Sequence, residues 1–394
     1  MAANDVVITG IGLLSSLGEG TEAHWQAFEQ GGTPKLETEK FAPYVVHPLG
    51  EVDWSQQIQR RSDQRQMETW QRIGTYTAGL ALADAGMKEN LPLVSTMDMI
   101  VAAAGGERDV AVDTQILEAS RSRNDRDVML NEKLTTELRP TLFLAQLSNL
   151  LAGNISIVHN VTGSSRTFMG EEGAGVTALT TAHARIRSGQ STHILVGGAL
   201  NAEYDDAFLC YELGGYLQRD GWSPLWDRDG RDGGGIITGS GGAFLVLESR
   251  AHAEARGARI YAELAAIAGD QVRRSKGGLQ NSISALVNKV DPSSTAPLAI
   301  SAASGAHEAT KAEKAALAVR PALAVRGFSS MTGHLKEAQM PFAVALAALS
   351  VHKGKSFSPL DTKNEAVTAD TIFSALAVVT GSHRSEGAAL VKKA

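Results

Sequence analysis

The chain has a single cysteine, no excess of basic residues and no long apolar run, and each of these absences excludes a class of protein. Cys210 is its only cysteine, which excludes an intramolecular disulfide and any metal site built from several cysteines. Basic residues (37) are fewer than acidic ones (43), and the net charge of −6 gives a nucleic-acid partner no electrostatic support. No apolar run reaches the roughly 18 residues that a membrane-spanning helix needs. The sequence therefore predicts a protein that neither binds nucleic acid nor spans a membrane.

The remaining composition is that of a folded globular chain. Hydrophobic residues make up 43% and charged residues 20% of the 394 residues, which excludes a disordered chain. Forty glycines against 11 prolines predict many tight turns and close backbone approaches. The first residues, MAANDVVITG, carry an aspartate where a secretory signal peptide has positive charge, so we expect a cytoplasmic protein.

Apolar runs and helical periodicity alternate along the chain. Short apolar or β-branched runs predict strands at 5–12, 97–104, 155–158, 165–169, 191–197, 242–248, 296–302 and 323–328. Apolar residues at helical spacing predict helices at 71–86, 173–188, 250–256 and 340–351. The polar segment 124–139 is expected to be a solvated excursion. The alternation predicts an α/β fold with a largely buried mixed sheet, in one continuous domain with a weak halving around residue 255.

Three features have ordinary structural explanations. The glycine run 233–242 lacks the Lys-Ser/Thr of a phosphate-binding loop and is interpreted as a structural turn. The ten histidines form no pair with metal-ligand spacing beside a carboxylate, so no metal site is expected. Cys210 lies in the apolar stretch FLCY, where a buried and inert thiol is expected.

Two polar positions are candidates for chemistry. His334 lies in the small-residue turn SSMTGHL, where a side chain can face a cavity, although a structural histidine is the simpler interpretation. Glu171 and Glu172 stand directly before the helix predicted at 173–188. Because free N–H groups and the helix dipole stabilise a carboxylate there, helix capping is their simplest explanation.

Several segments together resemble the β-ketoacyl-acyl carrier protein synthases of the thiolase fold. The opening VVITGIGLLSSLGEG is similar to that family's first strand and turn, and LAGNISIVHNVTG to the stretch before its nucleophile. SPLWDRDGRDGGGIITGSGGAFLVLES resembles the family's WD…RDG region, and FSSMTGHLKEA its KSMTGHL active-site turn. The resemblance implies a thiolase-like α/β fold of two pseudo-repeated βαβαβαββ halves, 1–254 and 255–394, in a five-layered αβαβα sandwich.

The resemblance also implies a Cys-His-His reaction centre, from which this chain departs. In the family a cysteine at a helix N-terminus takes the acyl chain as a thioester, and two histidines stabilise the enolate formed by decarboxylation. Matched by position, the nucleophile falls on Glu172, the first histidine on Ala302 and the ordering lysine on Ser329, and only the second histidine, His334, is kept. His307, five residues beyond Ala302, replaces the lost histidine only after a local realignment.

The C-terminal glycine loop departs as well. In the family a Gly-Phe-Gly-Gly-Thr-Asn-Gly turn gates the pocket and donates an oxyanion-hole N–H. Here the matching segment is GSHRSEG, residues 381–387, so Ser382 and His383 occupy the gate. Bulky residues do not easily adopt the positive φ of glycine, and a different course of this gate loop is expected. Glu313, the acidic residue of a KAE motif, is assigned to the pocket beside it.

These losses predict a condensing-enzyme scaffold without condensing chemistry. A glutamate cannot accumulate a thioester, and missing donors leave the enolate without stabilisation. The favoured hypothesis is a chain-length-factor-type partner of an active ketosynthase, working with an acyl carrier protein and no cofactor, as a heterodimer or a homodimer. Two alternatives stay open. One is an active 3-oxoacyl-ACP synthase or malonyl-ACP decarboxylase with an altered residue set, and the other is an acyl or carrier-protein binding module of unrelated use.

Overall fold

The strands form one large mixed sheet. The computed structural model describes residues 4–274, 278–368 and 371–394. These residues form an 11-stranded sheet in the order β11-β10-β12-β13-β9-β1-β8-β6-β4-β5, with β2 beside β1. The strands are β1 (Val6–Ser15), β2 (Gly18–Glu19), β4 (Asp98–Ala102), β5 (Ser165–Phe168), β6 (His193–Leu200), β8 (Gly241–Ser249), β9 (Ala262–Asp270), β10 (Leu298–Ser301), β11 (Ala324–Gly327), β12 (Ser374–Thr380) and β13 (Glu386–Lys392). A separate short pair joins β3 (Val46–His47) to β7 (Thr238–Gly239).

The sheet consists of two halves with the same topology. Counted along the chain within each half, the strands follow the order 3-2-4-5-1 in both β5-β4-β6-β8-β1 and β11-β10-β12-β13-β9. In each half the second strand pairs in parallel with the third and fourth, and the fifth is antiparallel. The halves meet where Val7 and Ile8 of β1 pair with β9. We therefore propose 1–254 and 255–394 as the two halves of one unit.

Helices cover and separate the two half-sheets. They are α1 (Gly20–Gln30), α2 (Arg61–Gln66), α3 (Thr69–Asp84), α4 (Leu91–Val94), α5 (Val110–Ser120), α6 (Arg126–Thr136), α7 (Leu142–Ala145), α8 (Leu150–His159), α9 (Glu172–Arg187), α10 (Asp205–Leu213), α11 (Arg250–Ala255), α12 (Gly278–Val290), α13 (His307–Leu317), α14 (Ser329–Thr332) and α15 (Gln339–Lys353), with 3₁₀ turns at η1 (Trp54–Gln56), η2 (Leu225–Asp227) and η3 (Lys336–Ala338). Within the described ranges, no helix is long and apolar enough to cross a membrane.

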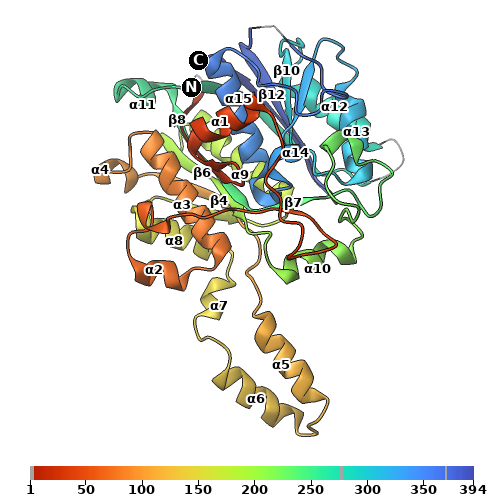
Figure 1. Ribbon diagram of the computed structural model, residues 1–394. Helices are drawn as coiled ribbons and strands as arrows, with labels where there is room; N and C mark the ends of the chain where they lie inside the picture. Colours follow the sequence, from red (N-terminus) through yellow and green to blue (C-terminus); the bar gives the residue numbers. More distant parts are fainter. Residues whose placement is uncertain (1–3, 275–277, 369–370) are drawn as a thin grey trace.

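The helices and half-sheets form five layers. Helices α9 and α15 contact strands of both halves and lie between them, as Figure 1 shows. Helices α3 and α8 cover the outer face of the first half, and α12 and α13 that of the second. Residues 339–351 of α15 are buried on every side, which explains why this Ala-rich helix has no polar face. The αβαβα architecture expected from the resemblance is the one found.

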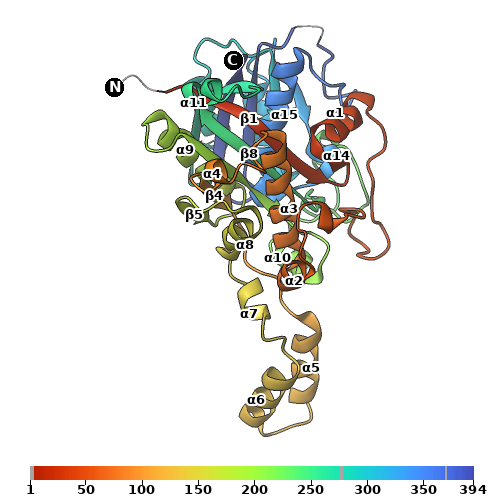
Figure 2. The ribbon, with the colours of Figure 1, turned by 90° about the vertical axis from the view of Figure 1, so that its left-hand side faces the viewer.

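Two segments, 155–158 and 124–139, differ from or extend the expectations from the sequence. The strand predicted at 155–158 is wrong, because these residues belong to α8, whose buried side carries Leu151, Ala152 and Ile155. A short apolar run does not by itself distinguish a strand from a buried helical segment. The solvated excursion expected at 124–139 contains α6, which with α5 and α7 stands away from the body in Figures 1 and 2. We call α5, α6 and α7 the arm.

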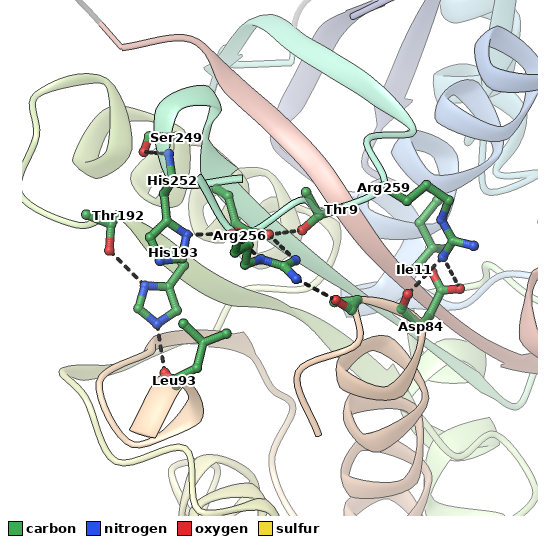
Figure 3. Close-up of polar contacts among 12 residues, drawn as sticks. Thr9, Ile11, Asp84, Leu93, Thr192, His193, Ser249, His252, Arg256 and Arg259 are labelled. Carbon is green, nitrogen blue, oxygen red and sulfur yellow. Dashed lines mark hydrogen bonds and ion pairs between the residues drawn. The ribbon is translucent and has the colours of Figure 1, made fainter. Parts of the chain in front are cut away.

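A polar cluster around the buried carboxylate of Glu248 holds the segment that joins the two halves (Figure 3). Glu248, at the end of β8, accepts hydrogen bonds from Arg256 Nε at 2.9 Å and Arg256 Nη2 at 2.6 Å. His252 Nδ1 lies 2.6 Å from the same carboxylate. Further on, Arg259 Nη2 donates to Asp84 Oδ1 at 2.6 Å. These contacts hold the connection from α11 to β9 against the end of α3.

Candidate functional site

A sharp turn delivers Glu172 to the interior of the protein. Strand β5 ends at Phe168, and α9 begins only four residues later with Glu172. Gly170 has φ 134° and Glu171 φ 59°, so a non-glycine residue occupies the left-handed region directly before the helix. Such a conformation costs about 1–3 kcal/mol and persists where the surrounding structure enforces it. Glu172 is fully buried at the first position of the helix.

Two polar groups from distant parts of the chain lie close to one oxygen of Glu172. His334 Nε2 lies 2.9 Å from Glu172 Oε1, and the Ser382 N–H donates to the same oxygen at 2.9 Å. Burial by itself would raise the pKa of Glu172, but the neighbouring His334 and the Ser382 N–H outweigh it and lower this pKa to about 2. The carboxylate is therefore ionised near neutral pH. The sequence predicted capping by the helix, whereas this hydrogen bond comes from the gate loop.

His334 is held by the glycine-rich segment and covered by a tyrosine. Its N–H donates to the Ile237 carbonyl at 2.8 Å, and its own carbonyl accepts from the Gly239 N–H at 3.1 Å. A Cβ at Gly239 would lie 1.9 Å from the Thr332 carbonyl oxygen, so only glycine fits this approach. The glycine run thus has a structural role, as expected, but it is not simply a turn, because it contains β7 and the start of β8, and it positions His334.

Tyr211 of α10 closes the site from another side. Its hydroxyl lies 3.3 Å from His334 Nδ1, and Lys336 Nζ lies 5.6 Å from the centroid of its ring. Burial, together with the charge of Glu172, raises the pKa of Tyr211 well above its ordinary value. The sequence analysis missed this residue, because Tyr211 and His334 are 123 positions apart and no local pattern links them.

Ala302 and Ser329 come together in a second buried cluster. Gln339 Nε2 donates to the Ala302 carbonyl at 3.1 Å and to Ser329 Oγ at 2.7 Å. Ser329 Oγ in turn donates to the Ala303 carbonyl at 2.8 Å. Ala302, Ser329 and Gln339 are each 0% exposed. The neutral amide of Gln339, which sequence reasoning missed, thus bridges the positions of the family's first histidine and lysine.

Glu313 is a further buried carboxyl group. It is fully buried on α13, and the Ser301 hydroxyl donates to it. No lysine or arginine among the described residues forms an ion pair with Glu313. Burial raises its pKa to about 7, and the bond from Ser301 offsets this only in part. Ser329 stands at the position of the family's lysine, and its neutral side chain provides no positive charge for this carboxylate.

Glu313 is expected to make the protein less stable as the pH rises. The pKa of Glu313 is about 7 in the folded chain and ordinarily 4.5, so folding favours the protonated carboxyl group. The stability that this group contributes is complete below pH 4.5 and is lost as the pH rises through 7. Glu313→Gln should therefore stabilise the protein at pH 8 by roughly 3 kcal/mol and have little effect at pH 4.5. Urea denaturation at both pH values tests this, with exposed Glu308→Gln on the same helix as the control. An equal effect at both pH values would contradict the assignment.

The gate loop is a tight hairpin between β12 and β13. The Gly381 N–H donates to the Ser385 carbonyl at 2.8 Å, and Ser385 adopts a positive φ of 69°. His383 is exposed, with Nδ1 3.2 Å from the Tyr216 hydroxyl. A Cβ at Gly173 would lie 2.4 Å from Ser385 Oγ, so the loop packs directly on the start of α9. The loop therefore seals the space above Glu172.

Two other residues lie away from this site. His307 begins α13 and lines a cavity of about 80 Å³ with Trp226 and Asp229. Cys210 is exposed, so the expectation of a buried thiol is wrong. On α10 the buried side carries Ala207, Phe208 and Tyr211, and Cys210 lies on the opposite, solvent-facing side. Among the residues that the structure describes, no three His, Cys, Asp or Glu side chains are placed to hold a metal ion.

Comparison with known proteins identifies the family. Residues 3–253 match the family described as "Beta-ketoacyl synthase, N-terminal domain". The 3-oxoacyl-[acyl-carrier-protein] synthase 2 of Vibrio harveyi is 26% identical over 274 residues, 67% of this chain and 62% of that protein. A Streptomyces rimosus protein named for an oxytetracycline polyketide β-ketoacyl synthase is 27% identical over 374 residues, 89% of this chain and 86% of its own length. Among solved structures, the ishigamide ketosynthase/chain length factor has a TM-score of 0.79 at 20% identity and full coverage of both chains.

The fold is thus the thiolase-like fold of the ketosynthases. The chain belongs to the β-ketoacyl synthase family, which confirms the resemblance carried by its motifs. Its match to the Vibrio synthase spans 62% of that protein's length.

Proposed function

We propose that this chain is a non-condensing, chain-length-factor-type subunit that pairs with an active ketosynthase in fatty acid or polyketide synthesis. The observation that carries the proposal is the fully buried contact between Glu172 and His334 at the family's nucleophile position. An ionised carboxylate is a poor acceptor of an acyl group, and it occupies the donors that would stabilise a thioester oxygen.

The second cluster supports the same proposal. Decarboxylation of a malonyl thioester needs donors that stabilise the developing enolate. The positions of the first histidine and the lysine carry Ala302 and Ser329, and the amide of Gln339 is already bonded to both residues. His334, the remaining histidine, faces Glu172 and Tyr211. A decarboxylase or an active synthase with an altered residue set is therefore less well supported than a partner subunit.

The free edge of β5 supports pairing with another chain. β5 is the last strand of the sheet, and an open edge that is not covered invites pairing across a two-fold axis. We propose an interface above ~2,000 Å², as obligate dimers have, that includes the segment 163–169. The acyl carrier protein named in the description of the Vibrio relative is the proposed carrier of the substrate.

Co-expression with an active ketosynthase tests the function. We expect a heterodimer by mass measurement, and acyl products whose length changes when this chain is replaced by another subunit of its kind. Products of the same length with and without this chain would contradict the proposal. A stable homodimer that does not bind the ketosynthase would favour the acyl or carrier-protein binding module instead.

The isolated chain is expected to form no acyl-enzyme. Because Glu172 stands where the family has its thiol, incubation with acyl-carrier and malonyl-carrier donors should leave its intact mass unchanged. An active ketosynthase treated in parallel provides the positive control. Cys210 is exposed and is the only thiol, so Cys210→Ser separates surface acylation from chemistry at the site. An adduct that maps to Cys210 and turns over would be the strongest evidence against the assignment.

A further inference from the structure

The gate loop is held on its outer side as well as on its inner side. On the inner side the Ser382 N–H donates to Glu172. On the outer side the loop faces the segment that follows β9, which ends at Asp270. Because Asp270 pairs with Glu386 at the start of β13, the chain that leaves β9 runs directly beside the loop. Arg274, four residues beyond the end of β9, is thereby placed against the backbone of the loop.

The guanidinium group of Arg274 contacts the loop at three points. Its Nη2 donates to the Gly381 carbonyl at 2.9 Å, and its Nε donates to the His383 carbonyl at 3.2 Å. The same Nη2 lies 3.0 Å from Glu386 Oε1. We call these three contacts the clamp. A planar guanidinium presents its donors in fixed directions, so one side chain ties the first residue of the loop, its tip and the start of β13 to one another.

The clamp brackets the residue that binds Glu172. Gly381 and His383, whose carbonyls Arg274 holds, are the two neighbours of Ser382, whose N–H donates to Glu172. A displacement of Ser382 away from Glu172 therefore moves at least one of the carbonyls that Arg274 binds. The inner hydrogen bond and the outer clamp consequently favour the same position of the loop.

The surroundings of the clamp make it stronger than a contact on the open surface. Glu386 is 1% exposed, and its second oxygen, Oε2, accepts from the Val272 N–H at 3.1 Å. The carboxylate that orients Arg274 is therefore fixed from two sides. Partly buried charges are screened less by salt and water than exposed ones. The other polar contact at the tip of the loop, between His383 Nδ1 and the Tyr216 hydroxyl, is exposed and carries no such charge pair.

We propose that Arg274 is the positioning residue that keeps the gate loop closed over Glu172. The proposal rests on the proposed function and deepens it, because it concerns the access of an acyl chain to the same site. Arg274 acts on the site through the backbone of the loop. With the loop held closed, the space at Glu172 is shut to an acyl chain, and the chain is left to the active subunit of the pair.

Hydrogen exchange tests the clamp. Arg274→Met should speed the exchange of the Ser382 N–H at least about 10-fold, the factor that corresponds to one lost hydrogen bond to a charged group. The Ala345 amide, in the buried helix α15, reports unfolding of the whole chain and should keep its rate. Arg274→Lys keeps the charge and should give an intermediate rate at Ser382. The matched control is Arg273→Met at the exposed neighbour. An unchanged rate at Ser382, or equal acceleration at Ser382 and Ala345, would overturn the proposal.

A thiol at position 172 measures access to the site directly. In the variant Glu172→Cys with Cys210→Ser, iodoacetamide reaches this thiol when the loop opens. Adding Arg274→Met should raise the alkylation rate at least about 10-fold, whereas adding Arg273→Met should not. A thiol from Ala345→Cys, also with Cys210→Ser, should react at the same rate with and without Arg274→Met. An alkylation rate at position 172 that does not depend on Arg274 would overturn the proposal.

The two tests separate this proposal from the proposed function. Both measure opening of the loop in the isolated chain, and neither needs a ketosynthase or a product. A loop that Arg274 holds closed, in a chain that leaves product length unchanged on co-expression, would support the clamp and refute the proposed function. A loop that opens regardless of Arg274, in a chain that does change product length, would refute the clamp alone.

Discussion

Glu172→Cys alone is expected to leave the protein without condensing activity. The substitution supplies a thiol at the start of α9, but Ala302 and Ser329 still lack the donors that stabilise the enolate. Because one missing donor of this kind lowers turnover about 10²–10³-fold, condensation should stay at least ~1000-fold below that of an ordinary synthase. Mass spectrometry of products from acyl-carrier and malonyl-carrier substrates measures this.

Further substitutions extend the test. Adding Ala302→His and Ser329→Lys should restore only traces of activity, because Gln339 occupies the space between those positions and the hairpin 381–385 seals the site. Turnover near that of an ordinary synthase from Glu172→Cys alone would contradict this account. His307 would then be the first candidate for the missing histidine.

Breaking the pair of Glu172 and His334 is expected to have the largest effect on stability. Glu172→Gln or His334→Gln should each lower the free energy of unfolding at pH 7 by about 3–5 kcal/mol, because either change leaves a buried polar partner uncompensated. The double variant should lose about 1–3 kcal/mol less than the sum of the two. Urea denaturation measures all three, and exposed Glu254→Gln should change stability by less than about 0.5 kcal/mol.

The effect of Glu172→Gln should also depend on pH in a definite direction. The folded pKa of about 2 lies below the ordinary 4.5, so the stability due to the ionised carboxylate is present above pH 4.5 and is lost as the pH falls towards 2. The difference between the parent chain and Glu172→Gln should therefore shrink in acid. Additive single losses, or a difference that grows in acid, would show that the pair does not hold the site closed.

Local patterns were sufficient for several of the buried strands and helices of the body. Strands β1, β6 and β8 are buried on both faces, so continuous apolar runs predict them. The helical spacing of apolar residues likewise predicts α3 and α15. The apolar run at 155–158 gave a wrong prediction, because four apolar or small residues fit both a strand and the buried side of α8. The expectation of a buried Cys210 thiol was wrong for a related reason. The neighbours Phe208 and Tyr211 are buried on one side of α10, whereas Cys210 faces solvent.

The sequence by itself determined which side chains stand at the family positions, since motifs with fixed spacing mark Glu172, Ala302, Ser329 and His334 without reference to any contact. Only the tertiary structure decided what those side chains do. The Glu172 carboxylate meets His334 and the Ser382 N–H, which are 162 and 210 residues away in the chain, and Gln339 bridges Ala302 and Ser329. Hydrogen bonding and burial depend on distances in space, and a one-dimensional pattern reports such distances only within a helix or a strand.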